Sequence, residues 1–255
     1  MSTLKPDQVL AVAAALLVVI VFAFRGQDGP RREGSASPGL PTAATQKGAG
    51  QVPAAAEGSD FDFYVLVLSW SPTHCSSDRG RGEDDDAQCR SGRPYGFVLH
   101  GLWPQYERGY PLNCVSDEPR EVDPAIIGRM MEISPSEELI QHEWEKHGTC
   151  SGLSQRGYFA MAKQAFESLD IPDLYERLER AARTTPGRVR DDFVAANPKL
   201  KAEAVSATCR RGELAEIWIC FDKSLEPRAC SNEVRRRHCG ERDVRMQAVR
   251  GDWPR

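Results

Sequence analysis

The hydrophobic pattern predicts two strands that lie far apart in the sequence. Residues 61–70 are apolar at nearly every position, which is typical of a strand buried on both faces in the middle of a sheet. Ser71 and Pro72 are expected to end this strand. Residues 216–221 form a second apolar segment of strand length near the end of the chain. We therefore expect a sheet assembled from distant segments.

A shorter apolar segment carries a histidine. Residues 97–100 predict a buried strand with His100 at its end, and Gly101 and Pro104 are expected to turn the chain directly afterwards. Helical spacing of apolar residues follows over 123–133, 158–169, 171–182 and 191–204, with a helix start at Thr185-Pro186. Because strands and helices come in mixed blocks, we predict an α+β fold with a largely antiparallel central sheet flanked by helices.

The segment from residue 134 to residue 148 has helix signals at both ends. Ser134 is a good N-cap, Pro135 suits the first helical position, and Glu137 completes a capping-box pattern. Gly148 can adopt the left-handed conformation that often ends a helix. We expect one short helix here.

This helix brings charged side chains onto one stripe. Glu143 and His147 are four residues apart and about 40° apart in azimuth, with Lys146 beside them. A merely solvated face could carry the same glutamate and lysine. His100 changes that interpretation, because two imidazoles with a carboxylate and an ammonium form an acid–base pair that can run phosphoryl transfer without a metal.

Length, composition and charge describe an ordinary globular protein. The chain has 255 residues, 40% hydrophobic and 27% charged, which is ample material for a real core. Its formal charge of −4 is not the profile of a protein that binds duplex nucleic acid through a basic patch. An enzyme that grips one or two nucleotides in a small pocket remains possible.

The N-terminal quarter predicts export. Residues 1–25 contain an apolar run over 9–24, which is short for a spanning helix of about 20 residues. We favour a cleaved signal peptide, with a membrane tether through residues 9–24 as the alternative, and expect an extracytoplasmic location, periplasmic or secreted. Residues 26–59 are mostly Gly, Ala, Pro, Ser and Thr and predict a flexible linker, which leaves 60–255 as the folded domain.

Eight cysteines follow residue 74. None forms a Cys-x-x-Cys pair, which argues against a zinc ribbon or a thioredoxin-type motif. An even number in a chain with an export signal indicates disulfide bonds. Spacing alone leaves their pairing open.

Two segments together resemble the active-site segments of the ribonuclease T2 family. They are residues 97–104, Phe-Val-Leu-His-Gly-Leu-Trp-Pro, and residues 142–150, His-Glu-Trp-Glu-Lys-His-Gly-Thr-Cys. Their order and separation also match, and the resemblance extends over residues 60–255. It implies a bacterial-type member with the family's α+β fold. It also implies an endoribonuclease for single-stranded RNA, with little base specificity and without cofactor or metal. We expect a monomer that does not act on DNA.

The resemblance assigns the catalytic roles. His147 is implied as the base that takes the proton of the ribose 2′-hydroxyl, and His100 as the acid that protonates the leaving 5′-oxygen. Lys146 and Glu143 are implied to lie at the phosphate. Histidine suits both proton transfers because its ordinary pKa, about 6.5, is near the working pH.

The same resemblance implies the binding residues. His142 and Trp103 would bind the phosphate and position the ribose, although His142 lies roughly 140° around an ideal helix from His147. Trp103, Gln105 and Tyr110 match the side chains that line the primary base pocket. Gln105 stands where fungal relatives often have an aspartate, which leaves the base preference open.

The family also implies a disulfide pattern. Cys114–Cys150 would join the two active-site segments, and Cys220–Cys230 would lie inside Cys209–Cys239 in the sequence. Cys75–Cys89 remains as the local fourth pair.

Other functions are weaker interpretations. The main alternative is a catalytically inactive RNA-binding or signalling protein on the same fold, and another is an interaction module held by disulfides with no site. A zinc site on the helix is disfavoured because His142 and His147 are five residues apart rather than four. Residues 84–86, Asp-Asp-Asp, are expected in a solvated loop rather than at a metal.

Overall fold

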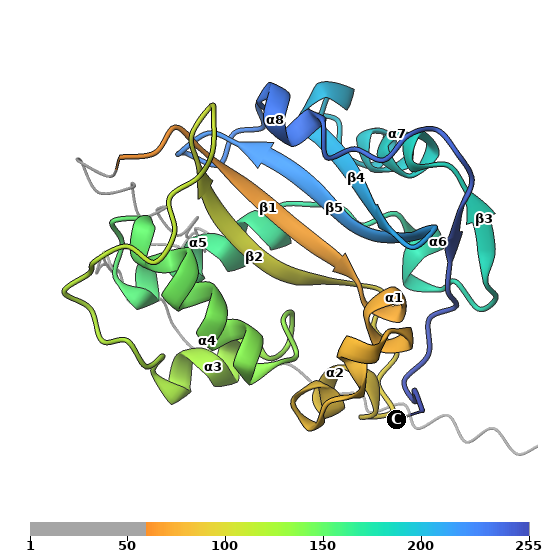
Figure 1. Ribbon diagram of the computed structural model, residues 1–255, viewed down its shortest axis with the longest axis horizontal. Coiled ribbons are helices and arrows are strands. Elements are labelled where there is room, and N and C mark those ends of the chain that lie inside the picture. The colour runs from red at the N-terminus through yellow and green to blue at the C-terminus, as the bar shows by residue number, and fades with distance from the viewer. Residues whose placement is uncertain (1–59, 255) are drawn as a thin grey trace, which may run out of the picture. The chain divides into compact units, whose positions relative to one another are not determined.

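The computed structural model describes residues 60–254, whereas the predicted signal or anchor (1–25) and linker (26–59) lie outside the described residues. Within the described part, six strands form one sheet in the order β2-β1-β5-β6-β3, and β4 also pairs with β5 (Figure 1). The strands are β1 (Phe63–Trp70), β2 (Phe97–Gln105), β3 (Ala182–Thr184), β4 (Val205–Arg210), β5 (Glu213–Phe221) and β6 (Val244–Met246). The β5–β6 pairing is parallel and the others are antiparallel, which confirms the predicted α+β class.

Strand β1 lies between β2 and β5, as its two-sided apolar pattern predicts. Tyr64, Leu66 and Leu68 belong to the main core, together with apolar residues of the helices. Val65 and Val67 point to the opposite face, where Trp103 and Trp218 pack against them. We call this second face the site face.

Strand β2 does not turn at Gly101 or Pro104, contrary to the expectation from the sequence. It continues to Gln105 and contains a bulge instead. Gly101 pairs with Val67 and Leu99 pairs with Leu68, so His100 is an extra residue that has no partner in the ladder. Neighbouring β1 supplies enough ladder hydrogen bonds to keep the segment extended.

Helix α4 (Glu137–Lys146) carries the second active-site segment, but both predicted end signals were wrong. Its N-cap is Ser136, whose Oγ accepts a hydrogen bond from the N–H of Leu139. Ser134 lies instead in the turn that follows α3, where its N–H donates to the Met130 carbonyl.

Gly148 opens a 3₁₀ turn (Gly148–Cys150) and has no positive φ. A glycine is needed there for a different reason. A Cβ would lie 2.4 Å from the Trp144 ring and 2.9 Å from that of Tyr158. Close packing of the turn on α4 and α5 therefore requires the missing side chain.

The other helices differ from the predictions mainly at their ends. They are α3 (Pro124–Met130), α5 (Gln155–Glu167), α6 (Asp173–Glu176), α7 (Pro186–Ala196) and α8 (Asn232–Arg235). Thr185 caps α7 as predicted, with its Oγ1 accepting from the Arg188 N–H, but this helix ends at Ala196. Figure 1 shows α3, α4 and α5 on the β2 side of the sheet and α7 on the β4 side.

The helix predicted over 171–182 was wrong. Only α6 is helical there, and residues 182–184 form β3, which pairs with β6 in the C-terminal tail. The tail also folds back beyond β6, because the N–H of Trp253 donates to the Cys89 carbonyl. A pairing made by such a distant segment leaves no local pattern.

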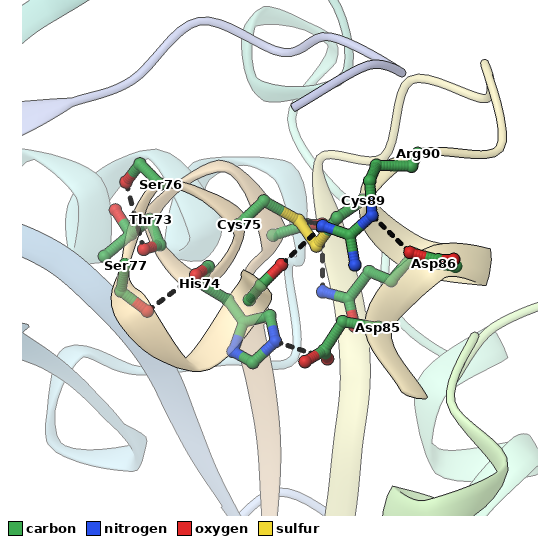
Figure 2. The surroundings of a disulfide bond; sticks show 12 residues. Thr73, His74, Cys75, Ser76, Ser77, Asp85, Asp86, Cys89 and Arg90 are labelled. Carbon is green, nitrogen blue, oxygen red and sulfur yellow. Dashed lines mark hydrogen bonds and ion pairs between the residues drawn. A yellow bond between two sulfur atoms is a disulfide. The ribbon is translucent and has the colours of Figure 1, made fainter. Parts of the chain in front are cut away.

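The segment between Cys75 and Cys89 is more ordered than the predicted solvated loop. The end of α1 (Ser71–Ser76), two 3₁₀ turns and α2 (Asp86–Cys89) follow one another there. Figure 2 shows the Cys75–Cys89 disulfide, with His74 Nε2 2.7 Å from Asp85 Oδ1 and Arg90 bonded to Asp86.

The structure joins the same four cysteine pairs that the resemblance implies. Cys114–Cys150 ties the chain after β2 to the turn after α4. The N–H of Asn113 also donates to the Lys146 carbonyl at 2.9 Å. Between residues 60 and 254, no helix is long and apolar enough to cross a membrane.

Candidate active site

The bulge at His100 brings the first active-site segment into position. In a regular strand, residues three apart point to opposite faces of the sheet. Here the rings of His100 and Trp103 lie 5.2 Å apart in an edge-to-face arrangement, so both side chains reach the site face. Because the bulge adds one residue, His100 and Trp103 both face the site, whereas in a regular strand only one of them would.

The His100 ring is held at Nδ1. Glu216 Oε1 lies 2.9 Å from this nitrogen and Ser69 Oγ lies 3.2 Å from it. Ser69 and Glu216 face each other across the β1–β5 ladder, so the register of the sheet brings them to one point. The other nitrogen, Nε2, lies 3.6 Å from Glu143 Oε1.

Glu143 reaches the site from α4 by passing over Gly101. Its side chain is 4% exposed, and its Oε2 accepts a 2.6 Å hydrogen bond from Trp103 Nε1. A Cβ on residue 101 would lie 1.8 Å from that same oxygen. Gly101 therefore provides the space that the carboxyl group occupies.

His147 follows the last residue of α4 and lies against Trp103. The two rings are stacked, with centroids 4.9 Å apart and planes 21° apart. His147 is only 2% exposed, and its Nδ1 is buried without a hydrogen-bond partner in the described part of the chain. This leaves Nε2 as the nitrogen that can exchange a proton. Lys146, the residue before it, is half-buried.

The surroundings shift the pKa values of the two histidines in opposite directions. Burial, with the positive charges of Lys146 and His100, lowers the pKa of His147 to about 3. Burial also lowers the pKa of His100, but the bond to Glu216 and the charge of Glu143 outweigh it and raise that pKa above its ordinary value. In mild acid His147 is therefore neutral and can accept a proton, whereas His100 keeps its proton to a higher pH than an ordinary histidine does.

The pKa of Glu143 is also shifted from its ordinary value. Burial raises its pKa to about 7, against the opposing effects of His100, the Trp103 N–H and Lys146. In mildly acidic solution this carboxyl group is therefore largely protonated. It can then donate a hydrogen bond to a phosphate oxygen instead of repelling it.

A cavity of 460 Å³ opens on one side of His100. Its lining includes His100, His142, Glu216 and Ser69, and Arg79 and Arg210 also contribute. Trp103 and His147 are not part of this lining, so the cavity lies beside His100 and not beside His147.

No group of three or more His, Cys, Asp or Glu residues within 60–254 is arranged to hold a metal ion. The separation of His142 from His147 agrees with this, since His142 is exposed and His147 is buried.

Comparison with known proteins identifies the family. The model of the ribonuclease T2 family matches residues 61–230. A ribonuclease of Aeromonas hydrophila is 39% identical over 219 residues, which cover 78% of this chain and 91% of the relative. A probable ribonuclease of Haemophilus influenzae is 33% identical over 182 residues, covering 68% of this chain and 62% of that protein.

The chain belongs to the ribonuclease T2 family. This membership identifies it as an RNA endonuclease. Solved structures agree on the fold. An RNase-related protein from Calystegia sepium superposes with a TM-score of 0.58 at 22% identity, covering 74% of this chain and 98% of that one. RNase NT, solved in complex with 5′-AMP, gives a TM-score of 0.50 at 24% identity, covering 77% and 100%.

The residues implied for binding in this T2 ribonuclease are less closely gathered than the catalytic ones. His142 is exposed and lines the cavity beside His100. Gln105 is buried, and its Nε2 donates to the Pro104 carbonyl of its own strand. Tyr110 is 43% exposed, in the segment after β2. The role of each in binding stays a prediction.

Sequence reasoning missed Glu216 and Ser69. Both belong to strands that were predicted, but neither lies in an active-site motif. The signal that could have found Glu216 was a single carboxylate in an otherwise apolar strand, Glu-Ile-Trp-Ile-Cys-Phe, because such a group needs a partner when it is buried.

Proposed function

We propose that this ribonuclease cleaves single-stranded RNA by transphosphorylation, with His147 as the base and His100 as the acid. The observation that carries the proposal is the pair of opposite pKa shifts on two histidines that flank the same tryptophan. A catalytically inactive protein would not need this division of roles.

The first step uses the nucleophile that RNA itself carries. Nε2 of His147 takes the proton of the ribose 2′-hydroxyl, and the 2′-oxygen attacks the adjacent phosphorus. The bond from phosphorus to the 5′-oxygen breaks, and Nε2 of His100 gives its proton to that oxygen. The products are a 2′,3′-cyclic phosphate and a free 5′-hydroxyl. DNA lacks the 2′-hydroxyl and cannot react in this way.

Charge on the phosphate rises as the pentacoordinate state forms. Lys146 supplies a fixed ammonium, and protonated Glu143 supplies a hydrogen bond, so both stabilise the developing charge. In the second step the pair works in reverse. His100, now neutral, takes a proton from water as the water oxygen bonds to phosphorus. The bond from phosphorus to the 2′-oxygen breaks, protonated His147 gives its proton to that oxygen, and a 3′-phosphate with a free 2′-hydroxyl results.

Substrate binding follows from the same geometry. The cavity beside His100 takes the nucleoside that leaves, because His100 protonates its 5′-oxygen. Trp103, with Gln105 and Tyr110, would bind the base on the other side. Stacking tolerates every base, so we propose little base specificity. RNase NT was solved with 5′-AMP and a mutant of RNase MC1 with 5′-UMP, two nucleotides that carry different bases.

We also propose that residues 60–255 form the catalytic domain of a monomeric, extracytoplasmic enzyme, behind a signal or tether (1–25) and a linker (26–59). Four disulfide bonds support export, since such bonds persist in oxidising compartments. N-terminal sequencing of protein recovered from the periplasm or medium tests the signal, and purely cytoplasmic protein would refute export.

The chemistry is tested by product analysis in EDTA. We expect polyuridylate to be cleaved at the same rate with and without EDTA, and early products to end in 2′,3′-cyclic phosphate. The reason is that the residues present supply an acid, a base and an ammonium. Activity abolished by EDTA and restored by one divalent ion would refute the proposal. Binding of RNA without turnover would instead support the inactive alternative.

The rate should depend on pH with an acidic optimum. His147, with its pKa lowered to about 3, is already neutral in mild acid, so the acid limb lies at low pH. The alkaline limb begins where His100 loses its proton, above the ordinary histidine pKa. These limbs belong to coupled groups. The measurement is kcat/KM on a dinucleotide from pH 4 to 9. A rate still rising at pH 8.5 would show that protonated His100 is not the acid.

A further inference from the structure

Glu216 is a partly buried carboxylate on β5 that no active-site motif contains. Its Oε1 lies 2.9 Å from His100 Nδ1, and its side chain is 21% exposed. The second oxygen, Oε2, accepts a hydrogen bond of 2.8 Å from Trp218 Nε1 and one of 3.4 Å from Thr208 Oγ1. Both oxygens are therefore engaged, and the carboxylate has a fixed orientation.

The sheet places this carboxylate with precision. Glu216 faces Ser69 across the β1–β5 ladder and Thr208 across the β4–β5 ladder. Its strand position therefore sets the position of the oxygen that meets His100. The histidine sits on a bulge, where the ladder does not fix it, so it needs an external partner to fix its ring.

Several charged groups act on His100, and they differ in how they behave in acid. Glu143 and Lys146 come from α4, as does His142; His147 follows that helix, and Glu216 comes from β5. Glu143, with its pKa raised to about 7, loses its negative charge in mild acid. Burial alone would raise the pKa of Glu216, but its bonds to His100, Trp218 and Thr208 outweigh this and lower it. Glu216 thus stays ionised where Glu143 does not.

We propose that Glu216 is a positioning residue that accepts the Nδ1 hydrogen of His100, keeps the imidazole protonated, and directs Nε2 at the leaving 5′-oxygen. This inference rests on the proposed role of His100 as the acid. Glu216 acts through His100 and does not touch the reacting atoms. Carboxylates that orient a histidine in this manner fix both its tautomer and its angle.

Ser69 is the competing partner, since its hydroxyl also lies near Nδ1. A hydroxyl carries no charge, so it can orient the ring but cannot stabilise the positive charge of the imidazolium. Substitution of the carboxylate by its amide keeps the shape and one acceptor oxygen, but removes the negative charge and the second acceptor while Ser69 stays in place.

The experiment compares Glu216→Gln, Glu216→Asp and the control Glu213→Gln in the full chain. Glu213 lies on the same strand, where its carboxylate accepts from Gln247 Nε2 at 2.7 Å. The readouts are the pKa of His100 by NMR titration and the pH profile of kcat/KM on a dinucleotide. We expect the amide variant to lower the pKa of His100, to move the alkaline limb toward acid, and to reduce kcat/KM by about 10–100-fold.

The aspartate variant should retain part of the rise in the His100 pKa. The control variant should change neither the His100 pKa nor the pH profile of kcat/KM. A merely structural role would lower activity or thermal stability without moving the His100 titration. An unchanged His100 pKa in Glu216→Gln, or in Glu216→Ala if the amide variant does not fold, would overturn the inference.

A double substitution separates this inference from the proposed function. If His100 is the acid, His100→Phe lowers the rate, and adding Glu216→Gln should lower it little further. If His100→Phe stays active, the proposed function fails, whereas the NMR titration still decides whether Glu216 holds His100. A further loss of 10-fold or more in the double variant would mean that Glu216 acts by another route.

Discussion

Replacing His147 or His100 with Phe should lower kcat/KM on a dinucleotide by at least about 10²–10⁴-fold, the usual contribution of a positioned base or acid. Phenylalanine keeps an aromatic ring of similar size, so stacking on Trp103 can persist at position 147 while proton transfer is lost. The measurement is steady-state kinetics at the optimum pH, with circular dichroism to verify folding.

His238→Phe is the matched control. Its Nδ1 accepts from the Ala207 N–H, but it lies outside the site and should leave kcat/KM within a few-fold of the parent. A loss below tenfold for both His100→Phe and His147→Phe would mean that the roles are wrongly assigned. The two variants should also differ in pH dependence, because each removes a different limb of the profile.

Gly101→Ala should lower kcat/KM by about 10²-fold, although it adds only one methyl group. The new Cβ would meet Glu143 Oε2 at 1.8 Å and Trp103 Nε1 at 2.7 Å, so the carboxyl group must move. Glu143 is buried and bonded to Trp103, and a displacement of about 1 Å in a catalytic group costs on the order of 10²-fold.

The control for this change is Gly128→Ala, in α3, where an added Cβ meets nothing within 4 Å. It should leave kcat/KM unchanged and stabilise the helix slightly, because alanine is the better helix former. Kinetics and thermal unfolding of both variants test the prediction. Parent-like kcat/KM in Gly101→Ala would show that the position of Glu143 does not matter.

The central strand and the two active-site segments could be predicted without the structure. The central position of β1 followed from its two-sided apolar pattern, because a segment without polar positions has no face for water. The two motifs were recognisable because they are long and rich in histidine and tryptophan. The cysteine pairs in the structure are also those that the motifs' family implies.

Local signals were less reliable at the ends of elements. Ser134 was the predicted N-cap, but Ser136 caps α4 in the structure, and the N–H of Ser134 bonds to the end of the previous helix. Residues 182–184 became a strand because the C-terminal tail pairs with them. Contacts between elements that are neighbours only in the folded protein leave no pattern in a short stretch of sequence.

The sequence alone determined which residue types would be available for catalysis: two histidines, a lysine and a glutamate in two short segments. Only the tertiary structure decided what each can do. A bulge turned His100 onto the same face as Trp103, and the strand register placed Glu216 against it. Burial in the folded protein lowered the pKa of His147, and the carboxylates of Glu216 and Glu143 raised the pKa of His100. Proton affinity depends on the solvent and charges within a few ångströms, and those are set by folding rather than by the order of residues.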